Sequence, residues 1–358
     1  MGIVRKKFGN QEFEAVYKVE EAEHDMRLDQ FLQIYLKSFS RESVKEKIKQ
    51  GDIEIIGRPG KHRPNSKVHY GDQVLMKIKR TVHEDEYWRG KKLDLIETPE
   101  IVFEDDDLIV ISKPPYMAAH PTGKHLFNCA TVFFEKVHNK TIHSIHRLDR
   151  ETSGIMLLGK NPKASNKITE LFEKNQVRKC YFFIAINKGF KNKDHFEANE
   201  RLGALEQGLK RVYINNFPES SNLGKSAKTN FSIVHQNKDY VLGLAFPKTG
   251  RQHQIRVHAM INNLPLLGDK LYLGSFEMFQ RFKDNIALED DHELMQIPRH
   301  ALHAIAINLD YKDKKTTFKA GIPDDLQNWL RTNLNINLDQ LRQELDTEID
   351  SYFKASLR

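Results

Sequence analysis

The chain has 358 residues, enough for two domains of ordinary size and a sizeable hydrophobic core. Its composition, 39% hydrophobic and 29% charged, excludes disordered and collagen-like chains, and we expect neither a membrane span nor a signal peptide because no apolar run is long enough. Two cysteines cannot build a disulfide framework, so we expect a reducing, cytoplasmic location.

The net charge of +7 is concentrated in one segment. Residues 26–80 contain 13 basic and 6 acidic side chains, so this segment accounts for the whole excess. A focused basic segment suits binding to a phosphate backbone better than a general role in solubility. We therefore expect a nucleic-acid-binding module in this part of the chain.

Two helices are predicted within the basic segment. Apolar residues of 28–35 recur at the i, i+3, i+4, i+7 spacing of a helix with one buried face. A second helix over 41–50 follows Ser40, a good N-cap residue, and ends at Gly51.

The second predicted helix carries a basic stripe, formed by Arg41, Lys45 and Lys49. These residues recur every four positions, so they share a face that differs from the apolar face. Strands are predicted at 53–55 and 74–78. The segment resembles the α-L RNA-binding motif of a small-subunit ribosomal protein in Arg27-Leu28-Asp29, Lys49-Gln50-Gly51-Asp52-Ile53 and Gly71-Asp72. The resemblance implies that the basic stripe contacts RNA. The alternative is a solvated helix face on a small structural domain.

The rest of the chain is predicted to be mainly an α+β domain. A hairpin over 101–111 opens it, and its acidic turn at 104–107 is interpreted as an exposed turn rather than a metal site. Strand-like runs then alternate with short helical stretches, and the leucines and aromatic residues of 326–353 sit at helical spacings. The predicted layout is an extension at 1–25, the RNA-binding module at 26–85, a linker at 86–98, a large domain at 99–325 and a helical extension at 326–358.

The densest polar cluster, 143–154, lies directly before an apolar strand predicted at 155–158. A loop that leads into a strand presents side chains well. Asp149 lies between Arg147 and Arg150, and nearby positive charge keeps a carboxylate ionised and able to act as nucleophile or base. A structural ion pair would give the same pattern, so the residues alone leave both interpretations open.

A second polar cluster, 246–258, follows a predicted strand and is predicted to begin a helix. Thr249 and Gln252 have the spacing of a capping box, while Gln252 and Arg256 share a helix face that can direct a guanidinium into a cleft. The two histidines of this cluster are five positions apart and lie on different sides of a helix, which disfavours a shared metal site.

Other common chemistries lack their motifs in this chain. It contains neither Gly-x-Ser-x-Gly nor a phosphate-binding loop ending in Lys-Ser/Thr, and the zinc deaminase combination of His-x-Glu with Cys-x-x-Cys is missing. What remains is a carboxylate flanked by arginines in a chain that also carries a basic segment.

The order of these motifs resembles that of a known family. Residues 146–154, His-Arg-Leu-Asp-Arg-Glu-Thr-Ser-Gly, resemble the long and specific catalytic motif of the RluA-type pseudouridine synthases. Four other stretches agree in order and spacing, and the match spans about 101–323. They are Glu104-Asp105 to Lys113-Pro114 with His120-Pro121, Lys179-x-Tyr181, Gly250-Arg251-x-His253-Gln254-Ile255-Arg256-Val257-His258, and Gly268-Asp269 to Tyr272.

The resemblance implies a pseudouridine synthase fold, with a mixed, mainly antiparallel central sheet, and isomerisation of uridine in RNA to its C-glycoside. The N1–C1′ bond breaks, and the rotated base is rejoined through C5 without a metal or an organic cofactor. Asp149 is then the essential carboxylate, acting on the ribose or on the uracil ring. Arg256 pairs with it, Tyr181 stacks on the target uracil, and Arg147 fills the space left by a flipped nucleotide.

The resemblance also implies that further side chains contact the substrate, namely His120, His146, Arg150, Lys179, Arg251 and His253. Structural roles stay open for some of them. Lys179 can contact only a phosphate, and His120 can stabilise a loop without touching the substrate. The aromatic strand around Tyr181 favours core packing by default.

Three features depart from the family pattern. Gln252 stands where threonine is more common, and Tyr116 stands where glycine is usual. Residues 273–298 look like a lengthened loop. The two single departures put the choice of substrate in doubt without touching Asp149.

We therefore predict a cytoplasmic enzyme that isomerises uridines in structured RNA, with large-subunit ribosomal RNA as the first substrate and transfer RNA as the alternative. Ribosomal precursor particles are a further expected partner, and no membrane partner is expected. The rival class is a non-catalytic RNA-binding or ribosome-assembly protein that has kept the fold. A glycosidase that pairs Asp149 with Glu151 is a weaker third option.

Overall fold

The computed structural model describes residues 3–8, 12–36, 40–79, 85–121, 125, 127–191, 194–206 and 208–355. The chain divides into two compact units. The first contains Met1–Asp85 and Ala118–Ile142, and the second contains Glu86–Met117 and His143–Arg358. Among the described residues, no helix combines the length and the apolar character needed to cross a lipid bilayer.

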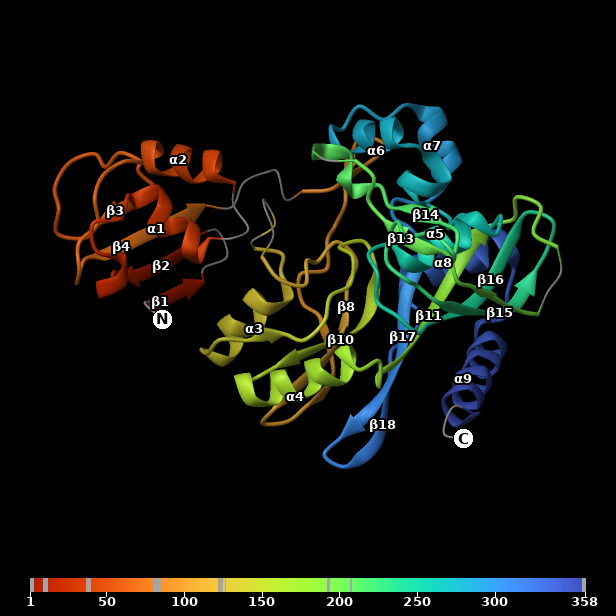
Figure 1. The fold of residues 1–358 in the computed structure, drawn as a ribbon. Coiled ribbons are helices and arrows are strands. Elements are labelled where there is room, and N and C mark those ends of the chain that lie inside the picture. Colours follow the sequence, from red (N-terminus) through yellow and green to blue (C-terminus); the bar gives the residue numbers. More distant parts are fainter. Residues whose placement is uncertain are drawn as a thin grey trace. The chain divides into compact units, whose positions relative to one another are not determined.

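The first unit contains a four-stranded antiparallel sheet and short helices (Figure 1). The strands, in sheet order, are β1 (Ile3–Phe8), β2 (Glu12–Lys18), β4 (Gln73–Lys79) and β3 (Ile53–Ile55). The helices are η1 (Glu21–Glu23), α1 (Leu28–Tyr35), α2 (Arg41–Gln50) and α3 (Ala130–His138).

Both helices and both strands predicted in the basic segment are confirmed. Ser40 caps α2 by accepting a hydrogen bond from the Ser43 N–H, and Gly51 ends the helix in the left-handed conformation. Val44 and Ile48 form the buried face of α2. Local capping and periodicity were therefore sufficient to place these elements.

Residues 1–25, predicted as a separate extension, instead supply β1 and β2 to this sheet. Phe13, Ala15 and Tyr17 of β2 lie in the same core as α1 and α2. β2 pairs with β4 along its whole length, from Glu12 opposite Lys79 onward. Because that partner strand lies far along the chain, no local pattern marks the pairing.

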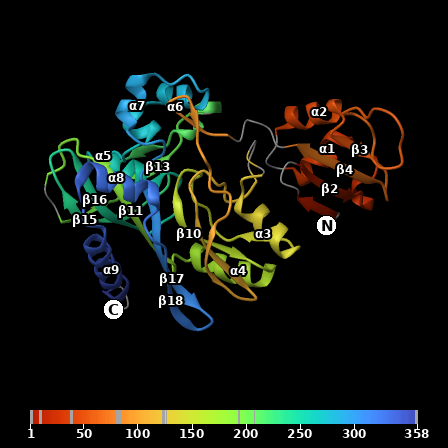
Figure 2. The same cartoon turned by 180° about the vertical axis from the view of Figure 1, so that it is seen from behind.

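The second unit is built on a ten-stranded mixed sheet (Figure 2). The order is β12-β15-β16-β11-β17-β10-β8-β7, with β18 beside β17 and β9 beside β10, and all pairs are antiparallel except β10 with β17. This is the mixed, mainly antiparallel α+β fold that was predicted. The strands are β7 (Glu100–Glu104), β8 (Leu108–Lys113), β9 (His143–Ser144), β10 (Ser153–Gly159), β11 (Arg178–Ile186), β12 (His195–Ala198), β15 (Thr229–Gln236), β16 (Tyr240–Pro247), β17 (Leu302–Tyr311) and β18 (Lys314–Lys319).

Helices and two small ribbons complete the second unit. The ribbons are β5 (Tyr87–Trp88) with β6 (Lys91–Lys92), and β13 (Arg201–Gly203) with β14 (Asn215–Phe217). The helices are α4 (Pro162–Glu173), α5 (Gln254–Ile261), α6 (Phe276–Lys283), α7 (Glu289–Met295), α8 (Asp324–Leu334) and α9 (Leu338–Ala355), with the short turns η3 (Gly208–Val212) and η4 (Lys270–Gly274).

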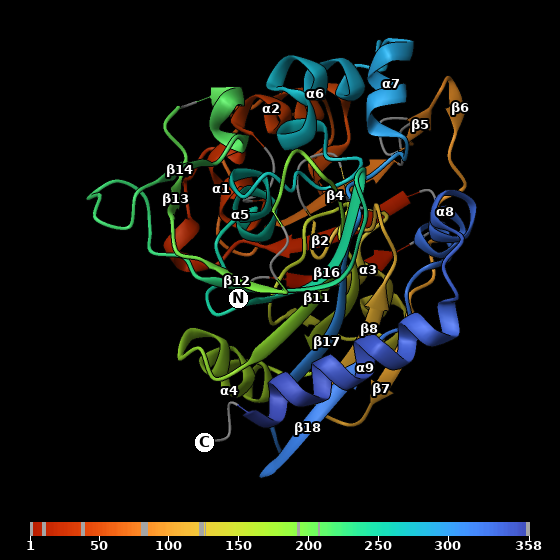
Figure 3. The ribbon, with the colours of Figure 1, turned by 90° about the vertical axis from the view of Figure 1, so that its right-hand side faces the viewer.

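The predicted helical end of the chain is confirmed as α8 and α9, but it belongs to the core of the second unit. Leu345 and Ile349 of α9 are buried in one cluster with Phe182 of β11 and Leu244 of β16. Figure 3 shows α9 running along the strands of the sheet. The apolar stripe of α9 thus covers a sheet face and does not form a separate extension.

Residues 86–98, predicted as a linker, begin with a ribbon that packs on the second unit. Trp88 stacks on Phe282 of α6 with ring centroids 5.9 Å apart, and it meets His292 of α7 edge-on at 4.5 Å. Arg89 forms an ion pair with Glu289, with the nearest N and O atoms 2.7 Å apart. These contacts hold the ribbon against α6 and α7.

The prediction of a lengthened loop at 273–298 is wrong, because α6 and α7 occupy most of it. Ser275 caps α6 through the Met278 N–H. Arg281 of α6 makes a two-pronged ion pair with Asp291 of α7, at 2.5 and 2.7 Å. Figures 1 and 2 both show α6 and α7 side by side at one end of the second unit.

Candidate active site

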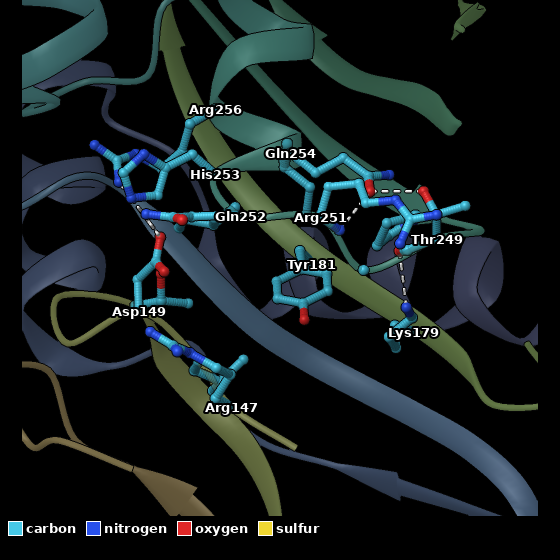
Figure 4. Close-up of a pocket in the computed structure, with 16 residues that line it drawn as sticks. Arg147, Asp149, Lys179, Tyr181, Thr249, Arg251, Gln252, His253, Gln254 and Arg256 are labelled. Carbon is cyan, nitrogen blue, oxygen red and sulfur yellow. Dashed lines mark hydrogen bonds and ion pairs between the residues drawn. The ribbon is translucent and has the colours of Figure 1, made fainter. Parts of the chain in front are cut away.

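A pocket of about 200 Å³ lies between the loop before β10, strand β11 and the start of α5 (Figure 4). Pockets that hold drug-sized ligands usually have volumes of about 300–1,000 Å³, so this smaller pocket suits a group no larger than a single nucleoside. Most of the side chains predicted to act in catalysis or substrate binding line it, namely Arg147, Asp149, Lys179, Tyr181, Arg251, His253 and Arg256.

A buried lysine fixes the loop that carries Asp149. Lys113 is fully buried, and its ammonium donates to the carbonyl oxygens of Pro114, Met117 and Arg150 at 2.9, 2.9 and 3.2 Å. Burial, and then the charges of Arg299 and Arg150, hold the pKa of Lys113 well below its usual value. Lys113 therefore orients the loop through its backbone rather than by reaching the pocket.

The end of the same loop is joined to strand β17 and the residues before it. The Thr152 hydroxyl lies 2.7 Å from Nε2 of His300, and the Ser153 hydroxyl lies 2.9 Å from Nδ1 of His303. Gly154 has a φ of 107°, and a Cβ there would lie 2.3 Å from the carbonyl oxygen of Ala304. Only glycine allows the two strands to approach this closely.

Asp149 presents a partly accessible carboxylate that stays ionised. Its side chain is 27% exposed, and Oδ2 lies 3.3 Å from Nη1 of Arg256 and 3.8 Å from Nε2 of His253. Burial alone raises the pKa of a carboxyl group, but the neighbouring His253, Arg256 and His300 outweigh it and lower the pKa of Asp149 to about 2. The ion pair with Arg256 that was predicted is therefore present.

Arg256 is itself held by a second, fully buried carboxylate. Its Nε and Nη2 donate to Oδ2 and Oδ1 of Asp269 at 2.6 and 2.8 Å, and Asp269 also accepts from the N–H groups of Leu271 and Tyr272. The guanidinium carbon lies 5.0 Å from the centre of the Tyr272 ring. These contacts leave Nη1 directed at Asp149 and keep Arg256 positively charged.

The role of Asp269 was missed in the sequence, where Gly268-Asp269 was matched only as part of a motif. Sequence spacing does not show that Asp269 and Asp149 share one arginine. The usable indication was chemical, because an arginine predicted to point into a cleft needs a carboxylate to offset its burial.

Tyr181 lies on β11, opposite Ala245 of β16, and contributes to the pocket lining. Its side chain is half-buried and packs against the apolar cluster under the pocket. Burial, and then the negative charge of Asp149, raise the pKa of Tyr181, so the phenol stays neutral. Figure 4 shows the ring between Asp149 and Lys179, and its stacking on a base stays a prediction.

Residues 249–253 form a tight loop before α5, so the predicted helix start with a Thr249–Gln252 capping box is wrong. The helix begins at Gln254, because His253 adopts a left-handed φ of 54°. The Gln254 side chain instead organises the loop, accepting from the Thr249 hydroxyl at 2.7 Å and from the Arg251 N–H at 3.0 Å. Lys179 donates to the Thr249 carbonyl at 2.9 Å on the pocket side.

Two predicted substrate contacts do not line the pocket. Nε2 of His146 accepts from the Leu157 N–H at 3.1 Å while its ring stacks on Phe172, and burial lowers the pKa of His146 to about 3. Arg150 makes an ion pair with Glu86 at 2.7 Å. Both side chains hold the backbone that carries Asp149.

Other predicted contacts lie in the first unit. His120 belongs to it, as does the basic stripe on α2. Arg41 and Lys49 are exposed and Lys45 is half-buried. All three stay predictions as RNA contacts.

Glu151 is fully occupied elsewhere, which removes the basis for a glycosidase pair. Its carboxylate accepts from Lys270 at 2.7 Å and from the His300 N–H at 3.2 Å, and it does not line the pocket. A second catalytic carboxyl group would have to face the same bound sugar as Asp149.

Comparisons with known proteins agree with this geometry. A family model described as RNA pseudouridylate synthase matches residues 107–260. The chain is 27% identical over 315 residues to the protein named ribosomal large subunit pseudouridine synthase D of Vibrio parahaemolyticus, covering 86% of this chain and 91% of that protein. It is 29% identical over 310 residues to the protein of the same name in Blochmanniella floridana, covering 84% and 92%. The chain is therefore similar to RNA pseudouridine synthases along most of its length.

Two solved structures share the fold of this chain. The human protein named RNA pseudouridylate synthase domain containing 4 superposes with a TM-score of 0.51 at 22% identity, covering 65% of this chain and 92% of that one. Its human relative, domain containing 1, gives a TM-score of 0.52 at 20% identity and coverages of 72% and 98%. The α-L resemblance of the first unit is not tested by these comparisons and stays a prediction.

The departure at Tyr116 has a clear structural setting. Tyr116 has a left-handed φ of 66°, a conformation that glycine adopts without strain. Its N–H donates to the Arg150 carbonyl at 2.7 Å, and the Arg150 guanidinium lies 5.5 Å above its buried ring. The tyrosine thus accepts a strained backbone and adds a cation–π contact beneath the Asp149 loop.

Proposed function

We propose that this protein is a pseudouridine synthase that isomerises uridines in large-subunit ribosomal RNA, with Asp149 as the essential carboxylate. The observation that carries the proposal is the ionised Asp149 paired with Arg256 at the wall of a pocket that suits one nucleoside. The names of the bacterial relatives that match along most of their length support the choice of RNA. We place the reaction in the cytoplasm, on RNA alone or in ribosomal precursor particles.

The reaction is an isomerisation, so no atoms are gained or lost. The Asp149 carboxylate attacks either C1′ of the ribose or C6 of the uracil ring, and the N1–C1′ bond breaks. The freed base turns within the pocket and C5 bonds to C1′. In the first case this step displaces Asp149 from C1′, and in the second Asp149 leaves C6 afterwards. The C5 proton is then lost and N1 is protonated, which regenerates the free carboxylate. Asp149 is suited to either attack, because its low pKa keeps it ionised throughout the neutral range.

The remaining pocket residues hold the nucleotide. Tyr181 offers its ring to the extruded base, and stacking of this kind is worth about 1–3 kcal/mol. Arg147 is exposed at the pocket wall, and its role in the proposal is to fill the space that the extruded nucleotide leaves in its helix. Lys179 and Arg251 supply positive charge for neighbouring phosphates.

Replacing Asp149 tests the catalytic assignment. Asp149→Asn is expected to bind RNA within a few fold of wild type but to form no pseudouridine by mass spectrometry of the RNA. Asp106→Asn is the matched control, because Asp106 is an exposed carboxylate in the β7–β8 turn, and it should keep full turnover. Pseudouridine formation by Asp149→Asn would contradict the assignment, and equal behaviour of all three proteins would favour a non-catalytic RNA-binding role.

The choice of RNA is tested separately with substrates that contain no pseudouridine. The protein is incubated with large-subunit ribosomal RNA transcripts, with transfer RNA transcripts and with unmodified large-subunit precursor particles. We expect site-specific pseudouridine in the ribosomal RNA, free or in particles, and none in transfer RNA. Modification of transfer RNA alone would overturn the ribosomal assignment.

A further inference from the structure

A chain of polar contacts leads from the Ile214 backbone through Tyr272 and His253 to Asp149. The Tyr272 hydroxyl is buried between two groups, the Ile214 N–H at 3.1 Å and Nδ1 of His253 at 2.9 Å. The far nitrogen of His253, Nε2, lies 3.8 Å from Oδ2 of Asp149 and lines the pocket. The sequence motifs give no role to Tyr272 and only a general substrate contact to His253.

The direction of these hydrogen bonds follows from counting protons. The Ile214 N–H can only donate, so the Tyr272 oxygen accepts from it and must place its own proton elsewhere. In the part of the chain that the structure describes, Nδ1 of His253 is the acceptor available to that proton. His253 therefore carries its own proton on Nε2, facing Asp149.

The opposite arrangement is unfavourable. If Nδ1 carried the proton, the lone pair of Nε2 would face the negative Oδ2 of Asp149, and the Tyr272 proton would have no acceptor. The groups facing His253 include Arg256, Asp149, Asp269 and His300. Burial, and then the charge of Arg256, lower the pKa of His253 to about 4, so the ring is a neutral donor at physiological pH.

The two oxygens of Asp149 are therefore unequal. Oδ2 faces both Nη1 of Arg256 and Nε2–H of His253, whereas no hydrogen bond to Oδ1 is present among the described residues. A carboxylate held by one oxygen presents the other in a fixed direction. The 3.8 Å separation is too long for a hydrogen bond, so a small approach of the loop is needed to complete the contact when a nucleotide binds.

We propose that His253 is a positioning residue, whose Nε2–H, fixed in that tautomer by the Tyr272 hydroxyl and the Ile214 N–H, holds Oδ2 of Asp149 so that Oδ1 is the atom that attacks the nucleoside. This inference rests on the proposed function, since it assigns the reacting atom of the same carboxylate. The Ile214 N–H, the Tyr272 hydroxyl and the neutral imidazole of His253 then form one hydrogen-bonded chain in which each proton has a fixed place.

Two amide substitutions test which nitrogen of His253 matters. The amide nitrogen of glutamine can occupy the place of Nε2, whereas that of asparagine occupies the place of Nδ1. His253→Gln is expected to keep kcat within a few fold of wild type, while His253→Asn lowers kcat by about 10- to 100-fold with little change in KM. Equal kcat values for the two variants would overturn the proposal.

Tyr272→Phe tests the role of the hydroxyl through a double-mutant cycle. In the wild-type background the substitution should lower kcat, because it leaves the His253 tautomer unfixed. In the His253→Gln background it should have little effect on kcat, because an amide has no tautomer to fix. A purely structural hydroxyl would lower the melting temperature and kcat equally in both backgrounds, which would contradict the proposal. The phenyl ring keeps the stacking against Arg256 in each case.

The tautomer can also be read without a substrate. In protein labelled with ¹⁵N-histidine, the His253 signals, assigned by their loss in His253→Gln, should show a protonated Nε2 at pH 7 and lose this preference in Tyr272→Phe. A protonated Nδ1 in wild type would overturn the proposal. This result is independent of turnover, so a wild-type protein that makes no pseudouridine would contradict the proposed function without affecting the outcome for His253.

Discussion

Lys179 differs from the other cations of the described pocket because its charge changes near neutral pH. Burial, and then the positive charge of Arg251, lower the pKa of Lys179 to about 8. Its ammonium donates to the Thr249 carbonyl, whereas Arg256 is held by two carboxylates. Such a cation can pair readily with an incoming phosphate, because among the described residues its internal partner is a neutral carbonyl and not a carboxylate.

Lys179 predicts how RNA affinity depends on pH. The ammonium is charged below about pH 8 and loses its proton as the pH rises through that value, so an RNA contact that needs the charge weakens in the same direction. We expect Kd for RNA to rise about fourfold between pH 6.5 and 8.5. Lys179→Arg keeps the charge and should give a flat profile. The prediction fails if the two proteins show the same pH dependence.

At the scale of secondary structure, the Asp149 loop depends on the approach of β10 to β17, the parallel pair of the sheet. Ser153 lies opposite His303 and Gly154 opposite Ala304 in this pair. The hydroxyls of Thr152 and Ser153 bond histidines from the other side of the junction. The motif that contains Asp149 thus serves both chemistry and the joining of two strands.

Gly154→Ala is expected to destabilise the protein by about 3 kcal/mol or more. The new methyl group would lie 2.3 Å from the Ala304 carbonyl oxygen, at a φ of 107° that alanine rarely adopts. Gly321→Ala is the control, because nothing lies within 4 Å of its added Cβ and its φ is not in the left-handed region. Urea unfolding measures both, and a similar loss in the two variants would show that close strand approach is not what Gly154 provides.

The sequence predicted elements whose determinants are local and missed those whose determinants are not. Ser40 and Gly51 mark both ends of α2 within the segment itself. Ser275 caps α6 in the same way, but Phe282 of this helix packs on Trp88, far back in the chain, and the segment therefore looked like a loop. The start of α5 was placed too early because the left-handed backbone of His253 is set by the tight loop, which residue spacing does not reveal.

At the scale of the whole molecule, the sequence predicted the residues that line the pocket better than the domain boundaries. Asp149, Tyr181 and Arg256, predicted from motifs, line one pocket. The boundaries at 26 and 326 differ from the structure because β2 pairs with β4, and α9 covers the large sheet. Likewise, the ion pair of Asp269 with Arg256 was found only in the structure. Folding alone brings Arg256 within reach of both Asp269 and the more distant Asp149.

The uneven charge of the whole chain predicts that the first unit contributes nonspecific RNA affinity. Replacing all three of Arg41, Lys45 and Lys49 by glutamine should weaken RNA binding. It should also reduce the slope of log affinity against log salt concentration by about 2, because each phosphate contact that forms releases slightly less than one counterion. Internal pairing is slight, with Arg41 Nε 3.9 Å from Asp29 and Lys45 3.6 Å from Glu42, so the charges are available.

The charge-matched control replaces Lys163, Lys167 and Lys174, which are exposed on or just after α4. If both triple variants show the wild-type slope, or lose it equally, the basic stripe is a solvated helix face and the α-L resemblance carries no RNA contact.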